Sequence, residues 1–501
     1  MELQQRNDDN GSSRPTVAND TFQKIIGSFG KYQFWLVCLI IVAKFPVASH
    51  QMAIIFLAPK TSYVCQDTNA ETCPCANPIY DTSIFNSTIT TEWNLICERK
   101  WLTSFTQTLF QLGTLLGSII FGMASDRFGR RLPLQISVLM QVVMGIAAAY
   151  TPDFWTFTFI RFFIGMSVGG VMVTTFVIIM EFVGPEHRDV LSALYQVPFN
   201  LGHVLLPVWS YYLRDFSDFQ LGISVPTILL LVYFFLIPES PRWLIAVNET
   251  EKAIEILEKV AKVNKRSVDV RKEVETYQKK LMENNTKRGT VIDLFLTPNL
   301  RKNIICMAFN WLSCSYCFYG VSQYVGQLSG NVFVNVASSA SVALIGSFLS
   351  IPLMKLMGRK TIVILFNFIC ALCLLLLCIV PEGVGSVVCA CIGVVSSFIA
   401  FVVVYLYCSE LFPTVVRNAA LGFSSMMARV GSMIAPFVVE MGDIAGWLPP
   451  LGFAVVPLIA TLVTFLLPET KGCTLTTTID EGENFGKKSD DKISKPSDNV
   501  E

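Results

Sequence analysis

Three basic side chains stand inside long apolar stretches of this 501-residue chain. Arg429 lies about fourteen residues into one stretch and Lys44 about ten into another, which places both near the middle of a membrane-length helix. Arg161 lies closer to the end of a third stretch, and no acidic residue stands at a comparable depth. A guanidinium offers a planar fork of N–H donors that fits a carboxylate. The pattern therefore indicates a site for an anionic ligand in apolar surroundings.

Aromatic side chains accompany these cations in several of the apolar stretches. Tyr405 recurs at helical spacing with Phe398 and Phe401, and Trp311 and Tyr319 can line one face of another helix. A pocket lined by rings around one charged anchor suits bulky amphiphilic ions. For any single ring, packing or contact with lipid is the alternative interpretation.

Other kinds of chemistry find little support in the sequence. The three histidines, His50, His187 and His203, are scattered and offer no paired base and nucleophile, so we predict no catalytic residues and no enzyme. We predict neither a cofactor nor a metal site, because the cysteines of 58–101 lack a paired Cys-x-x-Cys spacing. The net charge of zero implies no nucleic-acid partner.

The apolar stretches themselves predict the elements that position these residues. The composition is 52% hydrophobic and only 15% charged, and a helix of roughly 20 apolar residues crosses a bilayer. We therefore predict an all-α membrane protein with twelve transmembrane helices in two pseudo-symmetric bundles of six. The predicted spans are 34–57, 103–124, 132–150, 154–180, 189–213, 219–237, 303–324, 331–354, 361–380, 384–408, 415–439 and 447–467.

The two bundles are predicted because the chain repeats itself at an offset of 229 or 230 residues. Two similar bundles suit a transporter, which can rock them around a site between them. At this offset Arg429 corresponds to Asn200, which makes Asn200 a further candidate for the pathway. The repeated features are Glu181 with Arg188 and Glu410 with Arg417, Gly129-Arg130-Arg131 and Gly358-Arg359-Lys360, and Pro238-Glu239-Ser240 and Pro468-Glu469-Thr470.

The short basic loops predict the orientation of the chain. Basic residues cluster after the second and eighth spans, and such loops face the cytoplasm. Both termini then lie in the cytoplasm. The predicted domains are a tail 1–31, a first bundle 32–237 with an extracellular loop 58–101, a linker 238–302 with short helices, a second bundle 303–467 and a tail 468–501.

The predicted extracellular loop carries cysteines and one glycosylation signal. Four cysteines outside the cell predict two disulfides with three possible connectivities, and Asn86 begins the sequon Asn-Ser-Thr. We expect a glycan on Asn86 and none on the sequons of the predicted inner side. The cysteines are Cys65, Cys73, Cys75 and Cys97, and the inner sequons begin at Asn10, Asn19, Asn248 and Asn284.

The linker combines charge with helical periodicity. Ile254, Leu257 and Ala261 repeat at helical spacing, and Asn248 with Glu251 resembles a helix cap. We predict short amphipathic helices at the membrane surface; the alternative is a solvated spacer between the halves.

The stretch from Gly122 to Arg131, Gly-Met-Ala-Ser-Asp-Arg-Phe-Gly-Arg-Arg, resembles the signature loop of the major facilitator superfamily. The resemblance implies that Asp126 accepts hydrogen bonds from N–H groups at the start of the eleventh span, near residue 415, and latches the cytoplasmic side. The alternative is that these charges only fix the topology. The residues that fit such a gate are Asp126, Arg127, Arg130, Arg131, Glu181, Arg188, Glu410 and Arg417.

Within that superfamily the chain is similar to the organic ion transporters, which include organic cation, organic anion and carnitine carriers. The resemblance rests on the cysteine-containing loop, on Ala48-Ser49-His50, and on 238–244 (Pro-Glu-Ser-Pro-Arg-Trp-Leu) and 407–413 (Tyr-Cys-Ser-Glu-Leu-Phe-Pro). It implies Asp at position 429 in cation carriers and Arg in anion and carnitine carriers. Sugar carriers share the Pro-Glu-Ser end, but they are expected to have a Gln-Gln pair in span seven that is missing here.

These observations predict a multi-pass plasma-membrane transporter that moves organic anions or carnitine-like zwitterions by alternating access. Its partners are a small organic ion and the lipid bilayer, and its oligomeric state is not predicted. The alternatives are an organic cation transporter in which Arg429 is structural, and a receptor or scaffold that transports nothing. The predicted substrate-binding residues are Arg429, Lys44, His50, Asn200, Trp311, Tyr319 and Tyr405.

Overall fold

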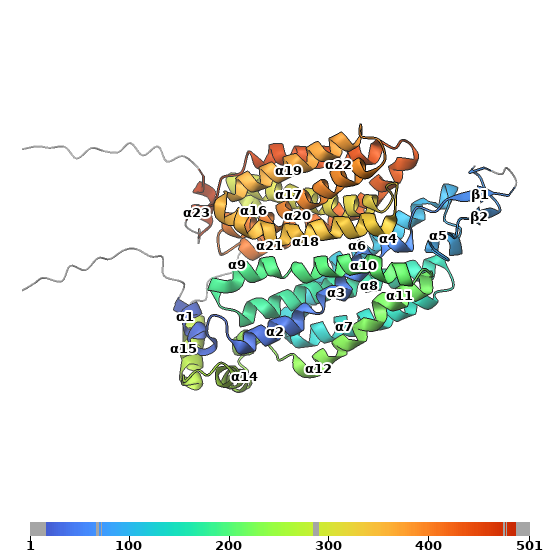
Figure 1. Cartoon of the computed structure of the whole chain (residues 1–501). Helices are drawn as coiled ribbons and strands as arrows, with labels where there is room; N and C mark the ends of the chain where they lie inside the picture. Colours follow the sequence, from blue (N-terminus) through green and yellow to red (C-terminus); the bar gives the residue numbers. More distant parts are fainter. Residues whose placement is uncertain are drawn as a thin grey trace, which may run out of the picture. The chain divides into compact units, whose positions relative to one another are not determined.

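The computed structural model describes residues 17–66, 70–71, 73–283, 290–473, 476 and 478–486, and these are almost entirely helical (Figure 1). The described residues form two compact units. The first unit comprises those within Met1–Thr286 and Gln323–Ser347, and the second those within Lys287–Ser322 and Phe348–Glu501. This division differs from the two predicted bundles in assigning Gln323–Ser347 to the first unit.

The first unit contains most helices of the first half of the chain. The predicted first span is built from three consecutive helices, and the predicted fifth span is divided into two, α9 and α10. The helices are α1 (Val17–Ile26), α2 (Lys31–Ile41), α3 (Lys44–Met52), α4 (Ile54–Leu57), α5 (Ile89–Glu92), α6 (Trp101–Phe128), α7 (Arg131–Ala147), α8 (Phe154–Phe182), α9 (Pro185–Leu194), α10 (Val197–Tyr212), α11 (Phe216–Ser224), α12 (Tyr233–Leu236), α13 (Pro241–Ala246), α14 (Thr250–Val263) and α15 (Val270–Glu283).

Glycines allow α6 and α8 to pack backbone against backbone. A Cβ atom at Gly117 would meet the carbonyl oxygen of Met166 at 2.0 Å, and one at Gly165 would meet that of Phe110 at 2.1 Å. Gly113 and Gly117 stand four residues apart on α6, as Gly165 and Gly169 do on α8. Small residues at this spacing let membrane helices approach closely, so α6 and α8 pack in direct backbone contact.

Part of the second half of the chain packs within the first unit. The ring of Phe333, at the start of α18, stacks on Phe56 with centroids 5.9 Å apart and meets the rings of Phe85 and Tyr211 edge-on or tilted. These aromatic contacts explain why the segment Gln323–Ser347 belongs to this unit.

The second unit is built from long apolar helices. Its core contains the buried side chains of Trp311, Tyr407 and Phe412. The helices are α16 (Asp293–Leu296), α17 (Pro298–Val325), α18 (Val332–Leu356), α19 (Arg359–Leu377), α20 (Val384–Leu411), α21 (Arg417–Glu440), α22 (Leu448–Thr464) and α23 (Ile479–Asn484). The end of α17 from Gln323 and the part of α18 up to Ser347 are assigned to the first unit.

Ten helical segments of the described chain are long and apolar enough to cross a membrane. The helix α22 is apolar but shorter, and the break between α9 and α10 keeps the predicted fifth span below the required length. Together these segments account for the twelve predicted spans.

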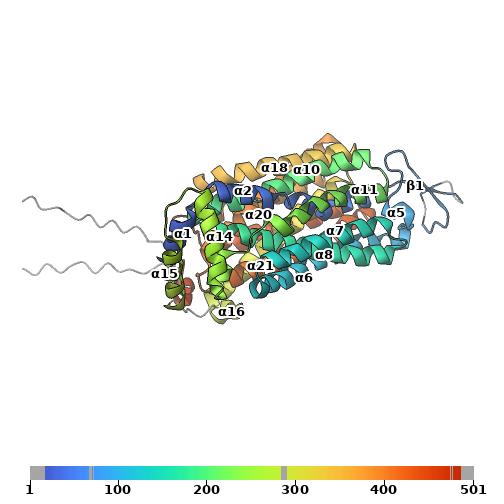
Figure 2. The same cartoon turned by 90° about the horizontal axis from the view of Figure 1, so that it is seen from below.

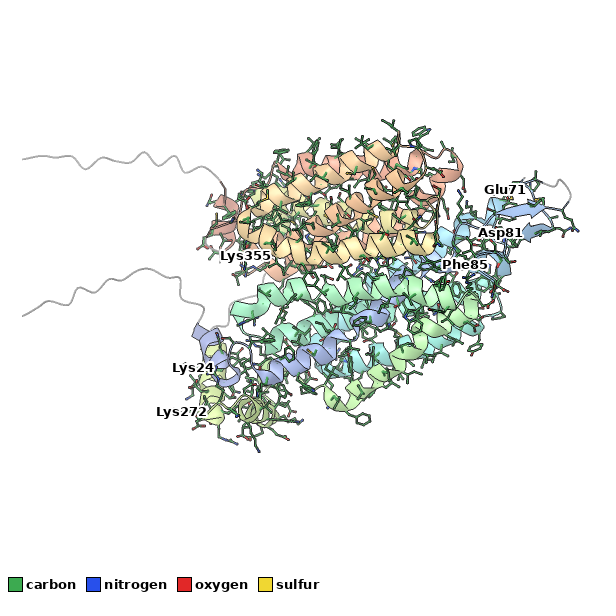
Figure 3. The ribbon with its side chains drawn as sticks, in the orientation of Figure 1. Lys24, Glu71, Asp81, Phe85, Lys272 and Lys355 are labelled. Atoms are coloured by element: carbon green, nitrogen blue, oxygen red, sulfur yellow. A yellow bond between two sulfur atoms is a disulfide. The ribbon has the colours of Figure 1, made fainter. Side chains whose placement is uncertain are left out.

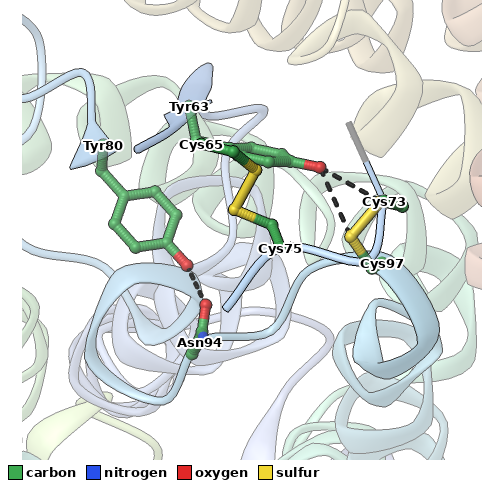
Figure 4. Close-up of a disulfide and its surroundings, with 7 residues drawn as sticks. All are labelled: Tyr63, Cys65, Cys73, Cys75, Tyr80, Asn94 and Cys97. Carbon is green, nitrogen blue, oxygen red and sulfur yellow. Dashed lines mark hydrogen bonds between the residues drawn. A yellow bond between two sulfur atoms is a disulfide. The ribbon is translucent and has the colours of Figure 1, made fainter. Parts of the chain in front are cut away.

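The loop between α4 and α6 folds into a small disulfide-bonded structure at one end of the first unit (Figures 1 and 4). Its two strands, β1 (Tyr63–Cys65) and β2 (Pro78–Tyr80), pair antiparallel. Cys65 pairs with Cys75, and Cys73 with Cys97, which is one of the three connectivities that the sequence leaves open. The Tyr63 hydroxyl lies 3.3 Å from the sulfur of Cys73 (Figure 4).

The linker forms helices at the opposite end of the first unit, where α14 and α15 pack with α1 (Figure 2). The ring of Phe22 lies 5.7 Å from that of Tyr277, and the Arg242 guanidinium stands 4.4 Å from the Phe22 ring centroid. The exposed Lys24 of α1 and Lys272 of α15 mark this end in Figure 3.

The predicted cap of α14 is wrong. Glu249 precedes the helix without a capping side-chain bond, and the Asn248 side-chain oxygen instead accepts a hydrogen bond from Gln278 at 2.8 Å. Asn248 has a φ of 66°, a left-handed conformation that asparagine tolerates and that commonly ends a helix. Asn248 therefore ends α13 and ties it to α15.

Candidate functional site

Arg429 of α21 is half-buried and meets two tyrosines from other helices of the second unit. Its guanidinium lies beside the hydroxyl of Tyr319 on α17, and its charge acts on that tyrosine and on Tyr405 of α20. Both tyrosines are half-buried. Three helices thus bring one cation and two phenol groups together.

Trp311 extends this cluster with a large apolar surface. Its ring centroid lies 4.6 Å from that of Tyr405 and 5.7 Å from that of Phe401. Trp311 is 1% exposed, and its indole N–H has no hydrogen-bond partner among the described residues. A guanidinium, two phenols and an indole N–H form a donor set that fits a carboxylate attached to an apolar body.

A glycine two residues after Arg429 explains the close approach of α21 to α17. A Cβ atom at Gly431 would meet the carbonyl oxygen of Leu312 at 2.4 Å. The helices can therefore approach backbone to backbone, and Arg429 comes within reach of Tyr319.

The other predicted substrate-binding residues lie in the first unit. Lys44 is 1% exposed, and its Nζ stands 3.8 Å from the ring centroid of Tyr195. Asn200 is fully buried and donates a hydrogen bond of 2.9 Å to the hydroxyl of Ser347. The structure thus brings Arg429, Trp311, Tyr319 and Tyr405 together in one unit and places Lys44, His50 and Asn200 in the other.

A group of buried glutamines in the first unit was not predicted from the sequence to be part of a site. Gln107 accepts a hydrogen bond of 2.7 Å from Arg161 and donates one of 3.4 Å to the backbone carbonyl of Gln51. The side-chain amide of Gln51 in turn donates to the side-chain oxygen of Gln111. A neutral amide adds no charge to an apolar stretch, so the sequence alone does not distinguish it as a functional residue. The spacing of Gln107 and Gln111, one helical turn apart, was the available signal.

The predicted gate residues of the first unit form a dense polar network. Arg130 binds the Glu181 carboxylate through Nε at 3.1 Å and Nη2 at 2.8 Å, and its Nη1 donates to the Ser125 carbonyl at 2.6 Å. Burial alone lowers the pKa of Arg130, but the hydrogen bonds and charge of Glu181 raise that pKa above its ordinary value. Arg188 donates to the Val183 carbonyl at 3.3 Å.

The second unit repeats this network almost bond for bond. Arg359 binds Glu410 through Nε at 3.1 Å and Nη2 at 3.0 Å, and its Nη1 donates to the Met354 carbonyl at 2.9 Å. Arg417 donates to the Phe412 carbonyl at 3.3 Å, as Arg188 does to Val183. The internal repeat therefore extends from residue types to hydrogen-bond geometry.

Glutamates of the repeated Pro-Glu segments accept from the first N–H groups of a helix in each unit. Glu239 accepts from the backbone of Arg130 at 2.7 Å and of Arg131 at 3.2 Å, and Glu469 accepts from Arg359 at 2.8 Å. A carboxylate at this position is favoured by the helix dipole. The preceding Gly129 makes room, since a Cβ there would meet the Glu239 carboxylate at 2.4 Å.

The predicted latch residue Asp126 pairs with its own loop. Its carboxylate lies 3.2 Å from Nη1 of Arg130, and its side chain is 77% exposed. The neighbouring Arg127 is exposed and lies over the Phe128 ring, while Arg131 donates to the Phe234 carbonyl. The role of Asp126 at the start of α21 stays a prediction.

Comparisons with known proteins agree on one family. The profile of the family described as sugar (and other) transporter matches residues 35–480. An organic cation transporter protein of Drosophila melanogaster is 36% identical, over 83% of this chain and 78% of its own length. A beta-alanine transporter of the same fly is 32% identical, over 83% of this chain and 70% of its own.

The fold is also that of a solved transporter. The inward-open xylose transporter XylE of E. coli matches with a TM-score of 0.67 at 20% identity, over 89% of this chain and 98% of that one. This match confirms the predicted all-helical membrane fold of the major facilitator superfamily. The relatives are transporters rather than enzymes, as the scattered histidines predicted. The chain is a multi-pass membrane transporter and belongs to the organic ion transporter family of the major facilitator superfamily.

Proposed function

We propose that this transporter carries organic anions or carnitine-like zwitterions and that Arg429 binds their carboxylate. The observation that carries the proposal is the contact of the Arg429 guanidinium with the Tyr319 hydroxyl beside Tyr405. Arg429 is half-buried, so part of its side chain remains accessible.

The chemistry of the cluster supports a carboxylate with an apolar body. Hydrogen bonds to charged groups contribute about 1.5–3 kcal/mol each, so a bidentate carboxylate gains most from the guanidinium. The ring centroid of Trp311 lies 4.6 Å from that of Tyr405 and 5.7 Å from that of Phe401, and the faces of these rings suit the organic part of the ligand. The beta-alanine transporter of Drosophila is named for a zwitterion that carries a carboxylate.

An organic cation is the second candidate substrate. One of the two fly relatives is named as an organic cation transporter, and aromatic faces attract cations. In this alternative the rings of Trp311 and Tyr405 bind the substrate, and Arg429 serves only to join α21 to α17 through Tyr319.

We further propose the setting in which this site works. The protein resides in the plasma membrane with both termini in the cytoplasm, and the disulfide-bonded loop with Asn86 faces outward. The carrier operates by alternating access, and the Arg130–Glu181 and Arg359–Glu410 networks act in gating at the inner ends of their units. Lys44, His50 and Asn200 contribute to the pathway from the first unit.

The test is a side-by-side uptake measurement in cells that express the chain and in matched cells with an empty vector. The three labelled substrates are an aromatic carboxylate, carnitine and a quaternary amine. Saturable uptake of the carboxylate or of carnitine is expected. Uptake of the amine alone would overturn the proposal and assign the chain to the cation carriers.

A further inference from the structure

The first unit holds a second buried cation that the proposed function does not use. Arg161 of α8 is 2% exposed and stands about 10 Å along the helix from its first residue, at 1.5 Å per residue. Its contacts are all neutral: the Gln107 side-chain oxygen at 2.7 Å and the ring centroids of Phe110 at 5.1 Å and Phe157 at 5.7 Å. Its Nε has no hydrogen-bond partner within the described part of the chain.

The groups around Arg161 add further donors rather than a balancing negative charge. His50 of α3 lies close enough to feel the charge of Arg161, and its Nε2 has no hydrogen-bond partner among the described residues. Gln111 of α6 accepts from Gln51 through its oxygen, which leaves its amide nitrogen unpartnered in the same described set. All these side chains are buried and belong to one cluster between α3, α6 and α8.

The bonds of the cluster fix which atoms remain available. The oxygen of Gln107 is taken by Arg161, and its nitrogen donates to the Gln51 carbonyl. The atoms without a hydrogen-bond partner among the described residues include Nε of Arg161, the amide nitrogen of Gln111, Nε2 of His50 and the side-chain oxygen of Gln51. None of the ion pairs among the described residues includes Arg161.

A buried guanidinium without a counter-charge is strongly unfavourable in a membrane. Aromatic faces and one amide oxygen offset this only in part, because they carry partial charges. A compact anion that accepts several hydrogen bonds supplies the missing charge and engages the unpartnered donors at once.

We propose that this cluster is a binding site for a small monovalent anion, held by Arg161 with Gln111 and His50 as further donors. Chloride and the carboxylate of a small acid share the required chemistry. The site lies wholly within the first unit and does not involve Arg429, which belongs to the second. The anion balances the charge of Arg161 and stabilises the packing of α3, α6 and α8.

The test measures the thermal unfolding of the purified full-length transporter in detergent at constant ionic strength. Chloride, acetate and the bulky isethionate are compared in an Arg429→Gln background, so that only the first-unit site is probed. We expect chloride or acetate to raise the unfolding temperature saturably relative to isethionate. A response to acetate without one to chloride would identify a solute carboxylate as the natural ligand; the reverse would identify an inorganic anion.

Two further variants decide the location of the site. Adding Arg161→Gln to this background is expected to abolish the anion response, and Gln111→Leu to weaken the apparent affinity roughly tenfold, as expected for the loss of one hydrogen bond to a charged ligand. The absence of any anion response before these changes, or its survival in Arg161→Gln, would overturn the proposal. If Arg161→Gln does not fold, unchanged affinity in Gln111→Leu overturns it instead. No transport is measured, so failure of the carboxylate assignment at Arg429 leaves this test unaffected.

Discussion

Tyr316 and Tyr319 stand on the same helix, α17, but their hydroxyls have different partners. The hydroxyl of Tyr319 lies beside the Arg429 guanidinium, whereas that of Tyr316 donates a hydrogen bond to the Gly452 carbonyl at 3.0 Å. The first contact orients a candidate ligand group, and the second ties α17 to α22.

Because the partners differ, we expect removal of the hydroxyl to affect substrate binding at Tyr319 and stability at Tyr316. Tyr319→Phe keeps the ring but frees the guanidinium to reorient, so we expect the KM for a carboxylate substrate to rise roughly tenfold, equivalent to about 1.4 kcal/mol. Tyr316→Phe is the matched control and is expected to lower the unfolding temperature with KM unchanged. Equal KM values for the two variants would contradict the role given to Tyr319.

At this scale the sequence reveals charges better than it reveals their partners. Arg429 was identifiable because a cation in an apolar stretch is rare. Its contact with Tyr319 depends on how closely α21 approaches α17, which Gly431 permits and which no local pattern specifies. Tyr195, which lies beneath the amine of Lys44, carries no sequence signal of that role.

The packing of α6 against α8 depends on glycines where the two backbones approach each other. A Cβ at Gly113 would meet the Phe162 carbonyl at 2.1 Å, and one at Gly169 would meet the Thr114 carbonyl at 2.2 Å. Both obstacles are backbone atoms, so relief requires the helices to move apart.

We therefore expect Gly117→Ala to destabilise the protein by about 1–3 kcal/mol, the usual cost of overpacking. The unfolding temperature of the purified protein in detergent measures this effect. Gly422→Ala is the control, because a Cβ at that exposed position of α21 meets no atom within 4 Å. Alanine there is expected to leave stability unchanged or to raise it slightly; an equal loss in both variants would argue against backbone-to-backbone packing.

The two arginine–glutamate pairs offer a test of the internal repeat. Their closest distances are 2.8 Å for Arg130–Glu181 and 3.0 Å for Arg359–Glu410, with similar exposure of all four side chains. Double-mutant cycles to methionine are expected to give coupling energies of about 1–3 kcal/mol in each unit. The two coupling energies should agree within about 0.5 kcal/mol. A measurable coupling energy in one unit alone would show that the two pairs share their geometry but not their contribution to stability.

The elements were predictable where periodicity is strong and less so at their ends. Long apolar runs and the 229-residue offset predict the spans and the paired networks. The division of the fifth span into α9 and α10 was not predicted, because 189–213 is continuously apolar enough to suggest one helix. The prediction that Asn248 caps α14 was wrong because Asn248 has a left-handed backbone conformation that ends the preceding helix, α13.

The two ends of the first unit differ in chemistry. One end carries the disulfide-bonded loop, and the other carries α1, α14 and α15 with their lysines (Figure 3). Asn86 is exposed at the first end, and its side chain donates to Asp215 at 3.0 Å.

The proposed orientation predicts where glycans attach. Enzymatic removal of N-glycans should increase the gel mobility of the natural chain but not of Asn86→Gln, because the loop faces the lumen during synthesis. Asn248→Gln, on the linker, is the control and should leave the shift intact. A mobility shift that is lost in Asn248→Gln would contradict the proposed orientation, because it would place the linker in the lumen during synthesis.

At the scale of the molecule, composition and repeat predicted a twelve-helix transporter, and the family comparisons confirmed it. The grouping of Gln323–Ser347 with the first unit could not be predicted, because it depends on long-range contacts such as the stacking of Phe333 on Phe56. The substrate class depends on one anchor, and the family includes relatives named for different substrates.

Carboxylate uptake by Arg429→Asp, normalised to the amount of protein at the cell surface, tests the role of Arg429 most directly. We expect this charge reversal to abolish saturable uptake of the carboxylate, and Arg429→Lys to retain part of it because a point charge replaces the bidentate fork. Carboxylate uptake by Arg429→Asp at the natural rate and KM would contradict the assignment of Arg429 as the substrate anchor.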